Sequence, residues 1–243
     1  MIKSFFKDKR ITSVFMIVFI LILTMIVFVI SSGNKNKRLV DSMSPEEVAS
    51  VVEAGNFLAD GLRIIDNSDI VIGKKNAKVK VIVYEDLSSY YSAEFDKTLD
   101  LIRREVGEDV AIAFRPYADK MFSNSVSVNL WSQCANEQGK FFEARDLLLD
   151  EVKKESLSED YLDEYGQIIG LNQDLVNDCL SKEKYLPKLE KIKSEAERFD
   201  VYGVPTIFVD NEMIVGARSF NDTVNNSGEK LEGMRSIIYR HLN

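Results

Sequence analysis

Two serines three residues apart, Ser89 and Ser92, lie at the start of a predicted helix and enclose Tyr90 and Tyr91. Serine is a preferred helix N-cap, because its side-chain oxygen accepts a hydrogen bond from an otherwise unpaired backbone N–H. As a nucleophile, a serine hydroxyl needs a neighbouring base. The chain has one histidine, His241, two residues from its C-terminus. The pattern by itself therefore favours a helix cap over a catalytic hydroxyl.

The only two cysteines, Cys134 and Cys179, are the other residues with covalent chemistry. They lie 45 residues apart, so they do not form a redox Cys-x-x-Cys motif, and without further cysteines or nearby histidine they make a poor zinc site. In an exported domain they are consistent with one disulfide, worth about 4 kcal/mol through its effect on the unfolded chain. Two buried free thiols are the alternative. No metal or cofactor is expected.

Hydrophobic patterns predict the elements that position the serine turn. Residues 78–84 are dense in Val and Ile, which indicates a strand buried on both faces, and residues 70–73 predict another strand. Apolar residues at helical spacing over 92–106 predict a helix, which Gly107 can end. Residues 109–117 predict the next strand. The order strand, helix, strand indicates a parallel βαβ unit.

The rest of the chain changes character twice. Residues 122–199 predict four or five helical segments and no convincing strand. Residues 206–209 and 213–215 then predict a hairpin, and residues 229–242 a last helix. The helical block is expected to have its own core, made of the following large apolar residues: Trp131, Phe141, Phe142, Leu147, Leu148 and Leu149.

An uncharged, apolar run of twenty residues, 11–30, is about as long as a helix needs to be to cross a bilayer. A cleavable signal peptide is the alternative, with a basic start and a small-residue site at residues 31–33, but its apolar stretch would be roughly 7 to 15 residues. We expect a retained transmembrane anchor. Residues 1–10 then form a cytoplasmic tail, 31–43 a linker, and 44–243 a domain on the extracytoplasmic side of the cell membrane.

Charge is distributed unevenly between the two ends of the chain. Residues 1–38 hold seven of the 31 basic residues and one of the 39 acidic residues, which leaves a net charge of −14 on residues 39–243. Such a domain repels phosphate backbones at long range. Nucleic acid is therefore not an expected partner.

Three segments resemble the DsbA-like thiol:disulfide oxidoreductases. They are Tyr84-Glu85-Asp86-Leu87 before the serine turn, Cys134-Ala135-Asn136-Glu137-Gln138-Gly139-Lys140-Phe141-Phe142 in the helical block, and Gly203-Val204-Pro205-Thr206 before a strand. The second segment is the most specific, and the resemblance covers roughly residues 70–241. It implies an α/β, thioredoxin-like fold with an inserted helical subdomain at about residues 122–199.

The resemblance places the family's nucleophilic cysteine on Ser89 and its resolving cysteine on Ser92, with Tyr90 and Tyr91 between them. A thiol at a helix N-terminus has a lowered pKa and attacks disulfides as thiolate, whereas a hydroxyl cannot form or exchange a disulfide. Some relatives carry a buried carboxylate where Val83 stands. Engineered Cys-to-Ser replacement is an alternative, but the family usually has Pro at the position of Tyr90, which removal of sulfur would not require changing.

The resemblance also implies a cis peptide bond between Val204 and Pro205, beside the active-site turn, where extended peptide binds. Tyr90 and Tyr91 would add apolar area to that groove. We therefore expect a redox-inactive module that binds extended or unfolded polypeptide, or an exported protein partner, as a chaperone or assembly factor. The alternatives are an oxidoreductase whose active-site cysteines were replaced by serine, and a purely structural subunit.

Overall fold

The computed structural model describes residues 61–225 and 228–243. Every described residue belongs to one compact unit, Phe57–Asn243. The predicted anchor, its cytoplasmic tail and the linker lie outside the described residues. Over the described ranges, no helix is both long enough and apolar enough to cross a membrane.

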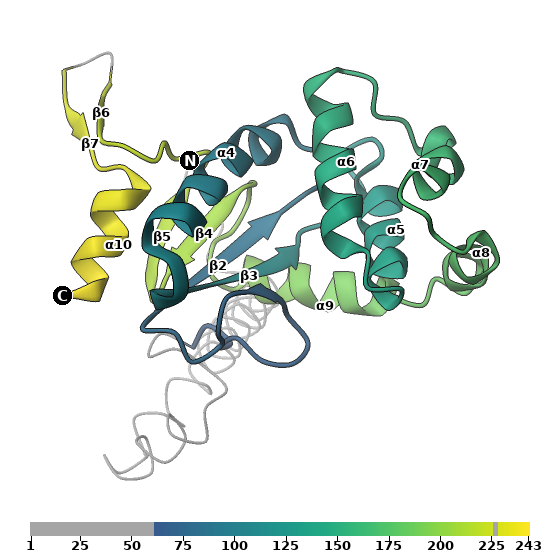
Figure 1. The fold of residues 1–243 in the computed structure, drawn as a ribbon, viewed down its shortest axis with the longest axis horizontal. Helices are drawn as coiled ribbons and strands as arrows, with labels where there is room; N and C mark the ends of the chain where they lie inside the picture. Colours follow the sequence, from purple (N-terminus) through teal and green to yellow (C-terminus); the bar gives the residue numbers. More distant parts are fainter. Residues whose placement is uncertain (1–60, 226–227) are drawn as a thin grey trace, which may run out of the picture. The chain divides into compact units, whose positions relative to one another are not determined.

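Five strands form a mixed sheet in the order β1-β3-β2-β4-β5 (Figure 1). Their bounds are β1 (Ile70–Ile72), β2 (Val79–Glu85), β3 (Val110–Pro116), β4 (Thr206–Val209) and β5 (Glu212–Val215). Strands β2 and β3 are parallel and are connected through α4 (Tyr90–Val106), so the predicted βαβ unit is confirmed. The other neighbouring pairs are antiparallel, including the predicted β4–β5 hairpin.

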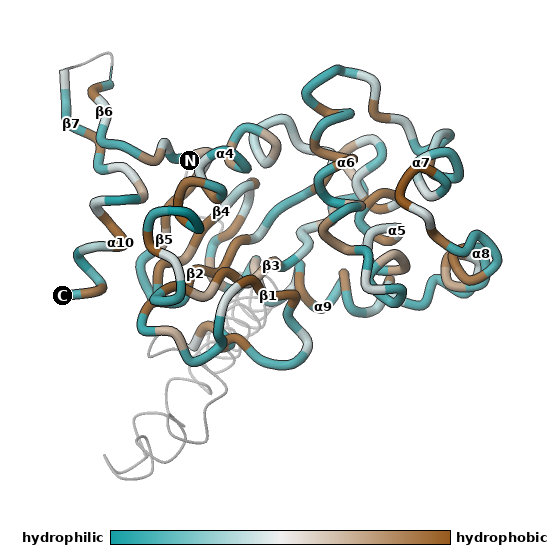
Figure 2. The backbone as a smooth tube through the Cα atoms, viewed as in Figure 1, coloured by the Kyte–Doolittle hydropathy of each residue, from teal (hydrophilic) through white to brown (hydrophobic). Residues whose placement is uncertain are grey.

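Strand β2 is buried on both faces, as its run of Val and Ile predicted. Val81 and Val83 pack with residues of α4 and of α10 (Met234–Leu242). Ile82 and Tyr84 point the other way, toward α9 (Leu186–Glu197). Figure 2 shows the matching concentration of hydrophobic residues along the central strands. The end of β2, where the serine turn begins, therefore has a rigid support.

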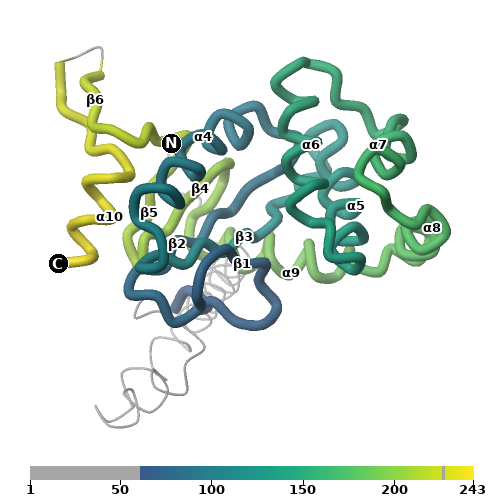
Figure 3. The backbone as a smooth tube through the Cα atoms, viewed as in Figure 1, coloured from purple at the N-terminus to yellow at the C-terminus, as the bar shows by residue number. Residues whose placement is uncertain are grey.

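The segment between β3 and β4 is helical, as expected for residues 122–199. Its other elements are α5 (Ser125–Glu137), α6 (Phe141–Lys153), the short 3-10 helix η3 (Glu159–Tyr161), α7 (Leu162–Ile168) and α8 (Gln173–Ser181). These helices enclose a separate core in which Trp131 is fully buried. Figure 3 shows α5 to α8 grouped at one end of the sheet and α10 at the other.

The prediction that all the listed apolar residues form the core of the helical block is wrong for two of them. Leu148 and Leu149 do pack there with Trp131. Phe141 and Phe142 instead contact the sheet, where their ring centroids lie 6.2 and 5.9 Å from that of Phe114 on β3. Both rings stand at the N-terminal end of α6, which is the end that meets the sheet.

The predicted last helix begins later than expected. Residues 230–231 form strand β7 (Lys230–Leu231), which pairs with β6 (Thr223–Val224). Helix α10 follows Gly233, whose backbone N–H donates to the Asp222 carboxylate at 2.8 Å. Pairing with β6 gives the backbone partners that a first helical turn would lack, because the first N–H groups of a helix have no partner inside it.

A buried ionic network joins β3 to α9 and to the segment before β1. Arg115 is 0% exposed and donates to Asp69 at 3.0 Å and to Glu195 at 2.8 Å. Arg63 contacts the same two carboxylates, and the Tyr84 hydroxyl donates to Glu195. Burial alone raises the pKa of Asp69, but the hydrogen bonds and charges of Arg115 and Arg63 outweigh it and hold that pKa below its ordinary value.

Candidate functional site

The serine turn is a helix cap, as its residue types predicted. Ser89 has an extended backbone, and its side-chain oxygen accepts a hydrogen bond from the backbone N–H of Ser92 at 3.4 Å. Helix α4 starts at the next residue, Tyr90. The N-terminal dipole of α4 therefore points at position 89, where it would stabilise a thiolate but has only a neutral hydroxyl to act on.

The second serine, Ser92, forms a hydrogen bond with the backbone that follows β2. Ser92 is buried, and its hydroxyl accepts a hydrogen bond from the backbone N–H of Asp86 at 3.3 Å. The Asp86 carboxylate accepts four hydrogen bonds: from the Ser88 N–H at 2.9 Å, the Ser88 hydroxyl at 2.8 Å, the Ser125 hydroxyl at 2.5 Å and the Asn129 amide at 2.7 Å. This carboxylate thus ties the serine turn to α5.

The surroundings of the two serines decide whether either hydroxyl could be activated. Among the described residues, no imidazole or carboxylate is within hydrogen-bond distance of the Ser89 or Ser92 hydroxyl. His241 contacts Asp210 and Glu212 at the β4–β5 turn instead. Val83, at the position of the family's buried carboxylate, is part of the sheet core. In the described contacts, Ser89 is a helix cap and Ser92 is a buried hydrogen-bond acceptor.

A cleft of about 560 Å³ opens beside the turn. Its lining residues come from the serine turn, from the loop after β3 and from the loop before β4: Asp86, Ser88, Ser89, Tyr91, Tyr117, Phe122, Ser123, Gly203 and Val204. Asp86 is the only charged group among them, and it is buried with its oxygens already occupied. The surface offered to a ligand is therefore mainly apolar and hydroxyl-bearing.

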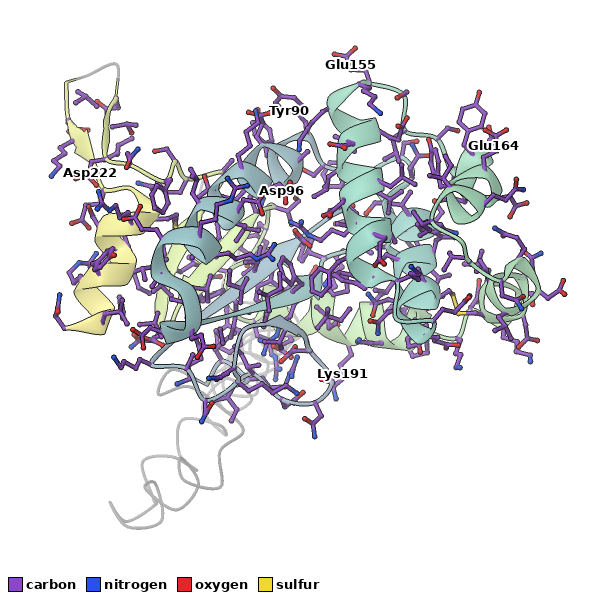
Figure 4. The ribbon with its side chains drawn as sticks, in the orientation of Figure 1. Tyr90, Asp96, Glu155, Glu164, Lys191 and Asp222 are labelled. Carbon is purple, nitrogen blue, oxygen red and sulfur yellow. A yellow bond between two sulfur atoms is a disulfide. The ribbon has the colours of Figure 1, made fainter. Side chains whose placement is uncertain are left out.

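The rim of this cleft carries large apolar side chains that face solvent. Tyr91, from the serine turn, is 64% exposed, and Phe122, from the loop after β3, is 60% exposed. Met121 and Tyr202, next to lining residues in the sequence, are also exposed. Tyr90 packs edge-on against Tyr91, with ring centroids 5.8 Å apart, and Figure 4 shows it projecting at the N-terminal end of α4. Exposed apolar side chains gathered at one cleft are typical of a binding surface.

The Val204–Pro205 peptide bond is cis, as the resemblance implied. Val204 lines the cleft, whereas Pro205 is buried and its carbonyl accepts a hydrogen bond from the Gly216 N–H at 2.8 Å. Within the described part of the chain, the backbone of Val204 has no hydrogen-bond partner. Of the four residues predicted to bind peptide, Tyr91 and Val204 therefore line the cleft, and Tyr90 supports Tyr91.

The two cysteines are joined to each other. Cys134 of α5 and Cys179 of α8 form a disulfide with their Cα atoms 5.9 Å apart, between neighbouring helices of the insertion (Figure 4). This is the pairing that the sequence predicted. Because the bond lies in the helical block, it takes no part in the cleft.

The sequence reasoning missed the second wall of the cleft. Tyr117, Phe122 and Ser123 follow β3, about thirty residues beyond the serine turn. The adjacent Met121 and Phe122 in an otherwise polar loop were the available signal, since large apolar residues in a short surface loop suggest contact with a partner.

Residues 66–225 match the sequence model of a protein family described as Thioredoxin. No curated protein matches the chain. Among solved structures, the chain is similar to α-DsbA1 of Wolbachia pipientis, with 17% sequence identity, 73% of this chain and 92% of that chain covered, and a TM-score of 0.57. It is similar to oxidised BdbD of Bacillus subtilis, with 17% identity, coverage of 72% and 92%, and a TM-score of 0.57. A periplasmic thioredoxin-like protein of Salmonella enterica serovar Typhimurium gives 19% identity, coverage of 79% and 96%, and a TM-score of 0.54.

At 17–19% identity, the solved structures show the fold alone. The family model matches residues 66–225, which is more than half of the chain. This chain belongs to the thioredoxin family, and DsbA-family proteins are its structural neighbours.

Proposed function

We propose that this protein is a redox-inactive, DsbA-like module that binds extended or unfolded polypeptide and acts as a chaperone or assembly factor. The observation that carries the proposal is the cleft itself: apolar side chains face solvent around it, and hydroxyls stand where disulfide exchange requires sulfur. The binding half of a thioredoxin-type site is therefore present without its reactive half.

Polypeptide is the ligand class that fits this cleft best. The backbone of Val204 is available to pair with an extended chain, as in recognition by strand addition. Tyr91 and Phe122 offer apolar area on the two sides for a side chain of the bound segment. The absence of an exposed charge among the lining residues favours uncharged segments and predicts binding that changes little with salt.

Loss of the Tyr91 side chain should weaken this binding without unfolding the domain. Burial of a large apolar side chain is worth about 1.5–3 kcal/mol, so Tyr91→Ala should raise the Kd for a fluorescent unfolded polypeptide roughly tenfold or more. Fluorescence anisotropy at low and high salt measures the Kd, and thermal unfolding checks the fold.

Tyr161→Ala is the matched control, because Tyr161 is also exposed but lies on η3, in the helical block. It should leave the Kd unchanged.

In the same preparation, the natural chain should neither reduce insulin nor oxidise a reduced substrate protein above background. Measurable exchange would overturn the redox-inactive assignment, and unchanged binding by Tyr91→Ala would remove the cleft as the binding surface.

We further propose that residues 11–30 anchor the protein in the cell membrane with the domain outside the cytoplasm. The length of the apolar run supports this, because it exceeds that of a signal-peptide core. Reporter fusions after residue 44 should report an extracytoplasmic location, and the purified protein should retain its first residues. A mature chain that begins near residue 34 would show that the segment is cleaved.

A further inference from the structure

The disulfide in the insertion cannot be the product of the chain's own redox chemistry. The 243 residues contain two cysteines, and both are in this bond. Positions 89 and 92 carry hydroxyls. Oxidation of two thiols to a disulfide removes two electrons and two protons, and no group in these residues can accept the electrons. The oxidant must therefore be another molecule.

Both sulfurs are closed off in the folded domain. Cys134 is 1% exposed and Cys179 is 2% exposed. Cys134 belongs to α5, most of which is buried. An external oxidant must therefore meet these sulfurs when the helices around them are open.

Of the helices α5 to α9, α8 has the fewest buried residues. It has nine residues, of which Val176 and Cys179 are buried and Leu180 is partly buried against the neighbouring apolar clusters. Surface contacts hold the two ends of α8. At its start, the Gln138 side chain and the Asn172 backbone exchange two hydrogen bonds, and just after its end Lys184 forms an ion pair with Glu137. Exposed ion pairs contribute about 0–1 kcal/mol. A short helix with so few buried contacts belongs to the part of a domain that opens locally before the core does.

We infer that this chain is the acceptor in a thiol–disulfide exchange with an external protein or small-molecule disulfide, which reaches the sulfurs through local opening of α8. The Cys179 thiolate attacks a donor sulfur, forms a mixed disulfide and releases one donor thiolate. The Cys134 thiolate then attacks the Cys179 sulfur, which closes the native bond and releases the second. The chain loses two protons and two electrons, and the donor disulfide becomes two thiols.

This assigns the protein a place in a reaction sequence. A dithiol-oxidising reaction must act on its insertion to close the Cys134–Cys179 bond. Although the chain has a thioredoxin-like fold, in this reaction it receives a disulfide from another molecule.

The test follows oxidation of the reduced, refolded protein by oxidised glutathione under anaerobic conditions, with free thiols counted by alkylation and mass spectrometry. Val176→Ala truncates the other fully buried side chain of α8 and should speed oxidation about tenfold, the factor that corresponds to about 1.4 kcal/mol of lost local stability. Ile207→Ala is the matched control, because Ile207 is equally buried but lies in β4. It should lower global stability and leave the oxidation rate unchanged.

Equal acceleration by both variants would show that the bond forms only through global unfolding and would overturn the route through α8. Closure of the bond without glutathione would overturn the acceptor role. If the reduced protein does not refold, the rate at which dithiothreitol reduces the native disulfide is measured instead. This reduction requires the same local opening of α8. Val176→Ala should then accelerate reduction and Ile207→Ala should not, and equal rates would again refute the route.

Discussion

The double variant Ser89→Cys, Ser92→Cys should reduce insulin disulfides, a reaction that the natural chain should not catalyse. The dipole of α4 points at position 89, and a thiol there should have a lowered pKa. Lowering a thiol pKa from about 8.5 to about 7 raises its thiolate fraction at pH 7 roughly fifteenfold. Position 92 is buried, as suits a resolving thiol that attacks from within the fold.

The insulin-turbidity rate measures this gain, with Ser89→Ala, Ser92→Ala as the control that changes the same positions without adding sulfur. The single variant Ser89→Cys should form stable mixed disulfides, because it has no second thiol to release them. A folded double variant whose new thiols react with iodoacetamide but do not exchange disulfides would show that the turn no longer has the geometry of a redox site.

Arg115→Ala should cost about 3–5 kcal/mol of stability, because it leaves the carboxylates of Asp69 and Glu195 buried without their main cation. Domains of this kind are stable by about 5–15 kcal/mol in total, so the variant should unfold at much lower denaturant concentration. Urea unfolding followed by circular dichroism measures the loss.

Arg104→Ala is the control, since Arg104 is exposed and its nitrogen lies 3.9 Å from the Asp100 carboxylate. Its effect should stay within about 0.5 kcal/mol. A loss below about 1 kcal/mol for Arg115→Ala would mean that water or Arg63 replaces the missing charge, and that the network contributes little to stability.

The parts of the fold that depend on short-range patterns could be predicted from the sequence. The Val and Ile run of β2, the helical spacing in α4 and the hairpin of β4 and β5 each reflect burial within one element. The cap at Ser89 is equally local, because donor and acceptor are three residues apart. The boundary of α10 could not be predicted, because residues 230–231 take their backbone partners from β6.

The short motifs that resemble a known family predicted two further features. These are the helical subdomain inserted into the thioredoxin-like fold and the cis bond before Pro205. The resemblance pointed to Tyr91 and Val204, which line the cleft, but not to the residues after β3 that line it as well. Phe122 joins Tyr91 there because the parallel arrangement of β2 and β3 brings the segments after both strands to one edge of the sheet. That proximity depends on the sheet order, which no local pattern encodes.

The sequence by itself determined the residue types: hydroxyls where exchange requires sulfur, two cysteines that have no other partner within the chain, and apolar strands that must be buried. Only the tertiary structure decided how these groups meet. The Asp86 carboxylate is filled by donors from α5, and Arg115 is balanced by acids from two distant segments. Buried polar groups need partners, and the partners are chosen by which elements pack together rather than by their distance along the chain.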